Sequence, residues 1–181
     1  MRLGSSTAVP RGKLTADQLR SGLDYDPATG IFRWRETRPK VVVGAVAGTL
    51  QHSYWMIHFR GVDYHAHRLA WLYMRGRWPD GDIDHRNGNR LDNRIDNLRE
   101  ATRSQNNANT RLPRHNTSGF KGVSYYRQTG RWMAYIRHEG RRYYLGMFTT
   151  AGEAAAAYDA AAIRLKGEFA RTNSMIQSEA A

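Results

Sequence analysis

The stretch that decides the fold lies between residues 82 and 107 and reads DIDHRNGNRLDNRIDNLREATRSQNN. It carries one carboxylate, one imidazole and two amides at spaced positions, namely Asp84, His85, Asn97 and Asn106. Carboxylate and amide oxygens are hard ligands that suit magnesium or manganese. An imidazole can take a proton from water near neutral pH. In this basic, polar context the set predicts a nuclease site with one metal ion.

The same stretch has the pattern of two short strands followed by a helix. We expect strands over residues 82–85 and 98–101, with a turn signal at Asn87-Gly88 between them. Thr102 and Gln105 form a capping box, so a helix should begin directly after Thr102. The carboxylate and the imidazole then end the first strand, and the second amide lies one turn into the helix. This arrangement can bring the carboxylate and that amide to a single ion.

The residues before this stretch also show helix and strand patterns. Thr15 and Gln18 form a capping box for a first helix. His65 and His67 are either extra metal ligands or, as we favour, structural residues or phosphate contacts. The expected elements are a helix over residues 16–23, strands over 31–35, 54–59 and 62–66, a strand and turn within 41–50, and a helix over 67–74.

After the central stretch comes a polar and basic segment, residues 108–117, which we interpret as a linker along DNA. Its arginines, Arg111 and Arg114, are either solvated charges or, as we favour, phosphate contacts. Three strands and a last helix, capped by Thr150 and ended by Gly167, should follow. We expect the strands over residues 121–126, 132–138 and 141–145, joined by hairpin turns at 128–130 and 139–140.

Composition limits the partners of the chain. Lys and Arg number 28 against 16 acidic residues, for a formal net charge of +12. Such a charge favours a polyanionic partner, most often nucleic acid. A basic amphipathic membrane binder would gather its basic residues on one helix, whereas here they run along the whole chain. The longest apolar stretch, residues 41–47, is too short to span a membrane. The absence of cysteine excludes disulfides and thiolate zinc sites and fits a reducing cytosol.

The central stretch resembles the HNH nuclease motif, in the variant whose third letter is Asn. The similarity extends upstream, through His67-Arg68-Leu69-Ala70-Trp71 and a turn containing Trp78-Pro79, to phage- and intron-encoded HNH homing endonucleases. It covers about residues 50–110. The resemblance implies that Asp84 and Asn106 bind a single divalent ion, that His85 is the general base, and that Asn97 orients His85 by hydrogen bonding.

Residues 118–171 resemble the Apetala/ethylene-response-factor DNA-binding domain of plant transcription factors. The resemblance is carried by Lys121-Gly122-Val123, Arg131-Trp132, residues 144–148, residues 154–161 and Asn173. In that family a three-stranded sheet enters the major groove. The implied DNA contacts are Lys121, Ser124, Tyr126, Tyr135, Arg137, Arg142 and Tyr144. Ser124 and Tyr126 stand where Arg is usual and Tyr144 where Trp is usual, so the plant sequence specificity is not expected.

Together these patterns predict an α+β protein, in which a ββα-metal HNH nuclease module is followed by a three-stranded antiparallel sheet packed on one helix. The expected parts are a disordered N-terminus (1–12), a nuclease domain (13–107), a basic linker (108–117), a DNA-binding domain (118–173) and a C-terminal tail (174–181). The expected activity is nicking or cleavage of duplex DNA with one Mg²⁺ or Mn²⁺, in a bacterial or phage-infected cytoplasm.

Three alternatives stay open at this stage. One metal site per chain predicts a monomer that nicks one strand, and double-strand cutting would need a dimer or two successive events. A DNA-binding regulator with a vestigial nuclease motif is the rival function, although the intact set of four site residues speaks against it. An RNA-binding protein is compatible with the charge, but a groove-reading sheet favours duplex DNA.

Overall fold

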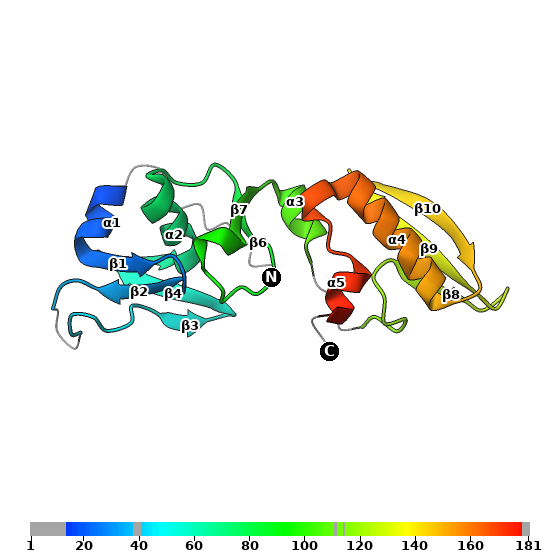
Figure 1. The fold of residues 1–181 in the computed structure, drawn as a ribbon, viewed down its shortest axis with the longest axis horizontal. Coiled ribbons are helices and arrows are strands. Elements are labelled where there is room, and N and C mark those ends of the chain that lie inside the picture. Colours follow the sequence, from blue (N-terminus) through cyan, green and yellow to red (C-terminus); the bar gives the residue numbers. More distant parts are fainter. Residues whose placement is uncertain (1–13, 38–40, 111, 114, 179–181) are drawn as a thin grey trace, which may run out of the picture. The chain divides into compact units, whose positions relative to one another are not determined.

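The computed structural model describes residues 14–37, 41–110, 112–113 and 115–178. The chain divides into two compact units, residues 1–100 and residues 101–181 (Figure 1). The domain boundaries expected from the sequence stay predictions. The segment 1–12, expected to be disordered, and the expected phosphate contacts Arg111 and Arg114 lie outside the described residues. Within the described part, no helix combines the length and the apolar character that a membrane crossing requires.

The first unit opens with a helix and a hairpin. Helix α1 (Ala16–Gly22) starts at Thr15, whose capping box with Gln18 is formed as predicted. Strand β1 (Leu23–Asp26) follows at once and pairs antiparallel with β2 (Ile31–Trp34). The sequence pattern had assigned Leu23 to the helix. It instead begins a strand, because its fully buried side chain alternates with those of the hairpin core.

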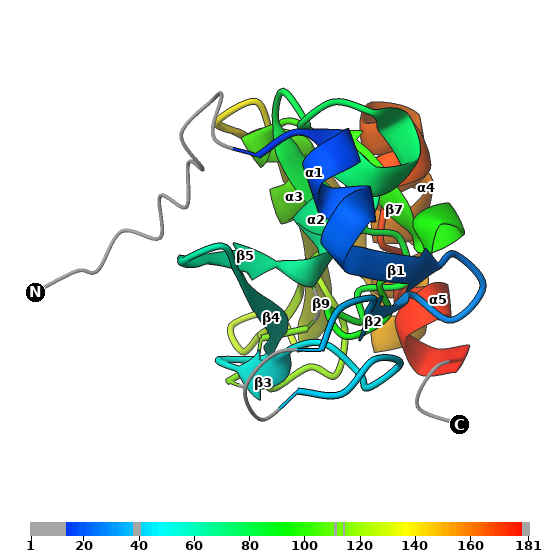
Figure 2. The same cartoon turned by 90° about the vertical axis from the view of Figure 1, so that its left-hand side faces the viewer.

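A second, three-stranded antiparallel sheet has the order β3 (Thr49–Gln51), β4 (Tyr54–Phe59) and β5 (Val62–His65) (Figure 2). The turn between β4 and β5 has positive φ at Arg60 and Gly61, as a tight hairpin with a type I′ turn requires. Helix α2 (Ala66–Arg75) follows β5 directly and packs on β4 and β5.

Strands β6 (Asp82–His85) and β7 (Leu98–Ala101) pair as predicted, with the 3-10 turn η1 (Ile95–Asn97) between them. Ile83 and Leu98 belong to the same buried cluster as the cores of the helices and hairpins of this unit. The packing of Ile83 and Leu98 in this core therefore fixes β6 and β7. This anchoring positions the polar residues at the end of β6.

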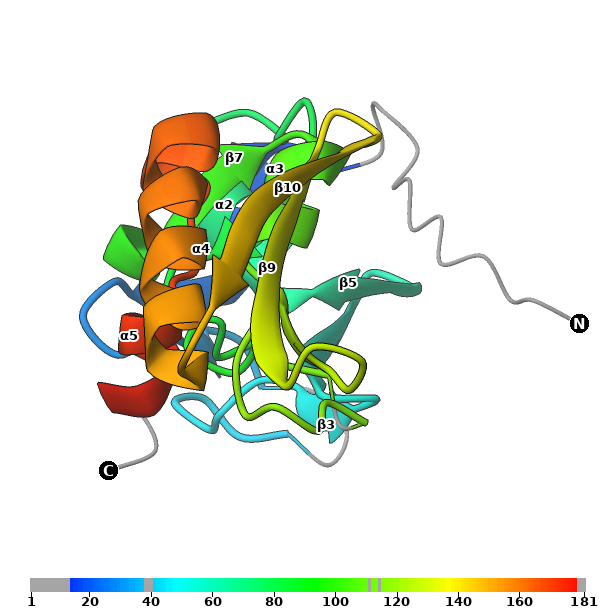
Figure 3. The same cartoon turned by 90° about the vertical axis from the view of Figure 1, so that its right-hand side faces the viewer.

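The second unit contains α3 (Arg103–Ala108), whose capping box at Thr102 is formed as predicted. Strands β8 (Val123–Tyr126), β9 (Arg131–His138) and β10 (Arg141–Phe148) form an antiparallel sheet with β9 in the middle. Helix α4 (Ala151–Lys166) lies along one face of this sheet (Figure 3). The mixed α and β class and the sheet packed on one helix are thus confirmed.

Small residues allow α4 to approach the sheet closely. Ala154, Ala155, Ala161 and Ala162 are buried on the side of α4 that contacts Ala134 and Ile136 of β9. A Cβ at Gly122 would overlap the ring of Tyr158, so only glycine fits beside that helix. The short turn η2 (Gly167–Phe169) ends α4, and a last helix, α5 (Asn173–Ser178), occupies most of the expected C-terminal tail.

A buried polar cluster joins the residues before β8, helix α4 and the start of α5. The Asn173 amide accepts a hydrogen bond from the Lys121 backbone N (2.6 Å) and donates one to the Lys121 carbonyl (3.2 Å). The Asp159 carboxylate of α4 accepts hydrogen bonds from the backbone N of Asn173 (2.6 Å) and of Ser174 (3.0 Å). The sheet, the helix and the C-terminal segment are tied together at this point.

Candidate active site and nucleic-acid interface

Asp84 lies near the end of β6 and is paired with an arginine that the sequence reasoning missed. Its Oδ2 accepts a hydrogen bond from Arg99 Nε at 2.9 Å and lies 2.7 Å from Arg99 Nη2 in an ion pair. The side chains of Asp84 and Arg99 are only 5% and 8% exposed. The signal for this pair was weak, because Arg99 is one of many arginines and only the pairing of β6 with β7 brings it to Asp84.

His85 is buried beside Asp84, and its Nε2 lies 3.2 Å from Asn93 Oδ1. Burial lowers the pKa of His85, although the Asn93 hydrogen bond and the Asp84 charge oppose that shift. The imidazole is therefore mainly neutral at pH 7. With the ring proton on Nε2 facing the Asn93 oxygen, the lone pair lies on Nδ1. A neutral, oriented imidazole of this kind can accept a proton from water.

Asn97 holds the loop between β6 and β7. Its Nδ2 donates to the Asp92 carbonyl at 2.8 Å, and its Oδ1 accepts from the Asn87 backbone N at 3.0 Å. The resemblance implied a hydrogen bond from Asn97 to His85. In the described structure Asn97 bonds to this loop, and Asn93, four residues earlier in the same loop, lies beside the imidazole. Sequence reasoning missed Asn93, since asparagine-rich loops give no sign of which amide turns inward.

Three histidine rings, including that of His85, and one tyrosine ring pack against one another. The centroids of His67 and His85 are 5.0 Å apart, those of His65 and His67 are 5.1 Å apart, and Tyr54 packs on both upstream rings. Burial lowers the pKa of His67 well below its usual value, and the neighbouring histidines add to this effect. The packing supports the structural interpretation of His65 and His67.

The two predicted metal ligands lie in different units. Asp84 is on β6 of the first unit and Asn106 is on α3 of the second, so their meeting at one ion stays a prediction. Among the described residues, no group of three His, Cys, Asp or Glu side chains is arranged to hold a metal. The donor chemistry nevertheless fits Mg²⁺ or Mn²⁺, because such ions keep several waters and use one or two carboxylates together with substrate phosphates.

The register of the second-unit sheet places most of the predicted DNA contacts on one face. Ala134 and Ile136 of β9 face α4, so the alternate positions of β9 and their cross-strand partners face outward. Six predicted contacts lie on this outer face: Ser124, Tyr126, Tyr135, Arg137, Arg142 and Tyr144. Arg131, which pairs with Tyr126, lies there too and was missed. Strand alternation alone could have found it.

Two arginines are prominent on the outer face. Arg137 and Arg142 are exposed and stand directly opposite each other on β9 and β10. The Arg142 guanidinium carbon lies 3.8 Å from the centroid of the Tyr135 ring, which orients the side chain. Like charges placed opposite each other destabilise a sheet. Their presence here therefore favours an anionic ligand over a structural role.

Lys121 differs from the other six predicted contacts. Its Nζ donates to the carbonyls of Ala108 at 2.9 Å and Thr110 at 2.7 Å. Burial, with help from the nearby Lys166 and Arg171 charges, lowers the pKa of Lys121 to about 8. The structure thus shows Lys121 joining the segment before β8 to α3, within the second unit.

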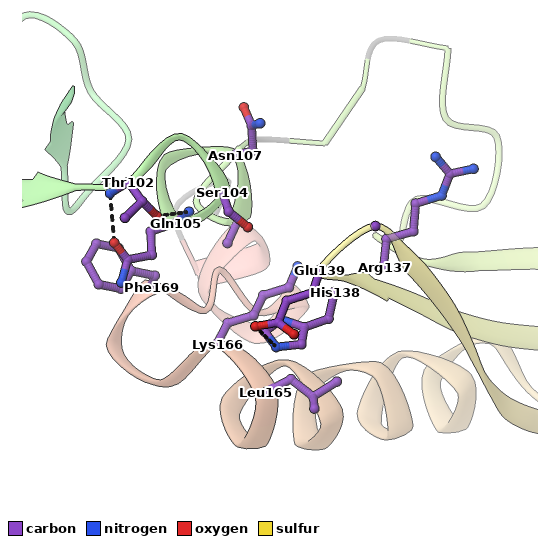
Figure 4. A pocket seen from close by; sticks show the side chains of 12 residues that line it. Thr102, Ser104, Gln105, Asn107, Arg137, His138, Glu139, Leu165, Lys166 and Phe169 are labelled. Carbon is purple, nitrogen blue, oxygen red and sulfur yellow. Dashed lines mark hydrogen bonds and ion pairs between the residues drawn. The ribbon is translucent and has the colours of Figure 1, made fainter. Parts of the chain in front are cut away.

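The second unit also has a cavity of about 540 Å³ between α3, the turn that joins β9 to β10 and the end of α4 (Figure 4). Lys166 lines it, and burial lowers the pKa of this lysine. Glu139 and His138 also line the cavity, and Glu139 Oε1 lies 3.8 Å from His138 Nε2. Of the predicted site residues, the cavity lining includes only Arg137.

Comparisons with known proteins agree with this two-part organisation. Residues 64–108, from β5 to α3, match the model of the HNH endonuclease family, and residues 118–168 match the model of the AP2 domain. Protein 3.8 of Escherichia phage T7 is 37% identical over 78 residues, which cover 42% of this chain. An AP2-like ethylene-responsive transcription factor of Arabidopsis thaliana is 47% identical over 66 residues, or 36% of this chain.

The matched regions span 64% of the phage protein and 14% of the plant protein. A second plant relative, APETALA2-like protein 2 of Oryza sativa subsp. indica, is 49% identical over 63 residues, which are 35% of this chain and 14% of that protein. The chain therefore carries an HNH endonuclease domain at residues 64–108 followed by an AP2 domain at residues 118–168.

Proposed function

We propose that this protein is a divalent-metal-dependent endonuclease that hydrolyses a phosphodiester bond of duplex DNA and is targeted by its AP2 domain. The observation that carries the proposal is His85. This buried and mainly neutral imidazole is oriented by Asn93 next to Asp84, within a region that matches the HNH endonuclease family. Strands β6 and β7 and helix α3 would form the ββα-metal module.

Each residue of the proposed active site has a distinct role in hydrolysis. His85 accepts the proton of the water that attacks phosphorus. Asn93 holds the ring directly, and Asn97 holds the loop that carries Asn93. Asp84 and Asn106 would hold the divalent ion. When bound, that ion supplies positive charge that stabilises the leaving oxygen.

The AP2 sheet supplies the second part of the function. Its outer face presents arginines for phosphates and tyrosine rings for sugars and bases, and Tyr144 is 62% exposed. Contacts of this kind fix the register of a protein on duplex DNA and provide much of its affinity. With one site per chain, we propose that a monomer nicks one strand.

A second candidate function, a DNA-binding regulator with an inactive nuclease motif, is favoured by one observation. The Asp84 carboxylate already forms an ion pair with Arg99, and this pairing reduces its attraction for a metal cation. A single experiment separates the two candidates. Supercoiled plasmid is incubated with the protein and Mg²⁺, Mn²⁺ or EDTA. Nicked circles with either ion and none with EDTA support the endonuclease, whereas intact plasmid in all reactions supports the regulator.

A further inference from the structure

The buried ion pair between Asp84 and Arg99 is an unusual feature for a metal ligand. Arg99 directs two N–H groups, from Nε and Nη2, to the same carboxylate oxygen, Oδ2. The partners come from the paired strands β6 and β7, whose Ile83 and Leu98 are part of the core. Because both side chains are almost fully buried, the pair cannot easily rearrange or exchange its partners with water.

This pair changes the charge of the predicted metal site. A carboxylate contributes one negative charge to a bound cation, and metal affinity rises with the number of charged ligands. Arg99 cancels that charge at very short range, and an amide ligand such as Asn106 adds none. Asp84, Arg99 and Asn106 together therefore offer a divalent cation little net negative charge, and we expect the anionic ligand to come from a DNA phosphate.

We propose that Arg99 makes metal binding conditional on DNA, by neutralising Asp84 until a DNA phosphate supplies the missing negative charge. This inference rests on the proposed function, since it assumes that Asp84 is a metal ligand. Its consequence is thermodynamic coupling. DNA tightens metal binding, and the metal must tighten DNA binding by the same factor. The free protein would then not hold an activated ion without its substrate.

Calorimetric titration of the full chain with Mn²⁺ tests the proposal. The titrations are made with and without a mixed-sequence DNA duplex, in a His85→Ala background that prevents cleavage, and the signal of Mn²⁺ binding to DNA alone is subtracted. We expect Mn²⁺ to bind about tenfold or more tightly with DNA present, within the usual range of coupling factors. Equal Mn²⁺ affinity with and without DNA would overturn the proposal.

Substitutions of Arg99 separate its charge from its packing. Arg99→Gln removes the charge and should raise the DNA-free Mn²⁺ affinity by about tenfold, which shrinks the coupling. Arg99→Lys keeps the charge and should bind DNA-free Mn²⁺ as weakly as the parent. Thermal melting verifies that both variants are folded. An Arg99→Gln protein that is folded and binds DNA-free Mn²⁺ no better than the parent would contradict the charge argument.

Asp84→Ala serves as the control for site identity, because it should remove the tight Mn²⁺ component in the presence of DNA. If no variant, including the parent, shows such a component with DNA, Asp84 is not a metal ligand, and the proposed function fails together with this inference. If the component is present but is equally strong without DNA, only the role of Arg99 is wrong.

Discussion

Replacing Arg137 and Arg142 by glutamine should flatten the salt dependence of DNA binding. Both guanidinium groups are exposed on the outer face of the AP2 sheet, opposite each other on β9 and β10. The logarithm of the DNA-binding constant falls linearly with the logarithm of the salt concentration, with a slope of about −0.9 per phosphate neutralised. If each arginine neutralises one phosphate, the slope of the double variant is shallower by about 1.8. Between about 50 and 200 mM salt, the parent should then lose about tenfold more affinity than the variant.

Fluorescence anisotropy of a labelled duplex, measured with the full chain at several salt concentrations, gives both slopes. Arg164→Gln is the matched control, because Arg164 is exposed on α4, which packs on the other face of the sheet. Its slope should equal that of the parent. The reasoning would be refuted if the double variant kept the slope of the parent, or if the control lost as much slope as one of the two sheet arginines should.

Three further predictions concern stability and the site. Asp159→Ala should lower the free energy of unfolding of the second unit by on the order of 3 kcal/mol in urea denaturation, because buried donors of Asn173 and Ser174 lose their acceptor; a loss well under 1 kcal/mol would contradict this. Burial holds the pKa of His67 well below 6.5 in the folded protein. Below about pH 6.5 the unfolded chain therefore binds a proton at this histidine that the folded protein does not, and the free energy of unfolding decreases as the pH falls. His67→Phe should weaken that pH dependence, and identical pH profiles would exclude the effect. Asn93→Ala should slow nicking on the order of tenfold with unchanged DNA affinity, less than the loss of the base itself; an unchanged rate would rule out the orienting role.

Local signals predicted the starts of α1, α3 and α4 correctly. The capping boxes at Thr15, Thr102 and Thr150 are all formed, because a cap depends only on residues within one turn of each other. The bounds of β6 and β7 were also right. Their short apolar cores, flanked by turn residues, leave few alternatives.

Features that depend on distant residues were missed. The pairing of Asp84 with Arg99 requires the register of β6 against β7, which no local pattern specifies. Asn93 lies in a loop that is held by Asn97 and by the ion pair of Asp92 with Arg94, and no local pattern specifies which amide of that loop faces His85. Lys121 stays a predicted DNA contact, but no local pattern indicated that its ammonium group bonds to carbonyls 11 and 13 residues away.

The most direct test of the central claim is the single-turnover rate of plasmid nicking by His85→Ala, measured beside its affinity for DNA. His58→Ala is the control, because His58 is an exposed histidine on β4. If His85 is the general base, its loss should slow metal-dependent nicking by about 10²–10⁴-fold while DNA affinity stays unchanged, and the control should nick like the parent. A His85→Ala protein that nicks as fast as the parent would contradict the account.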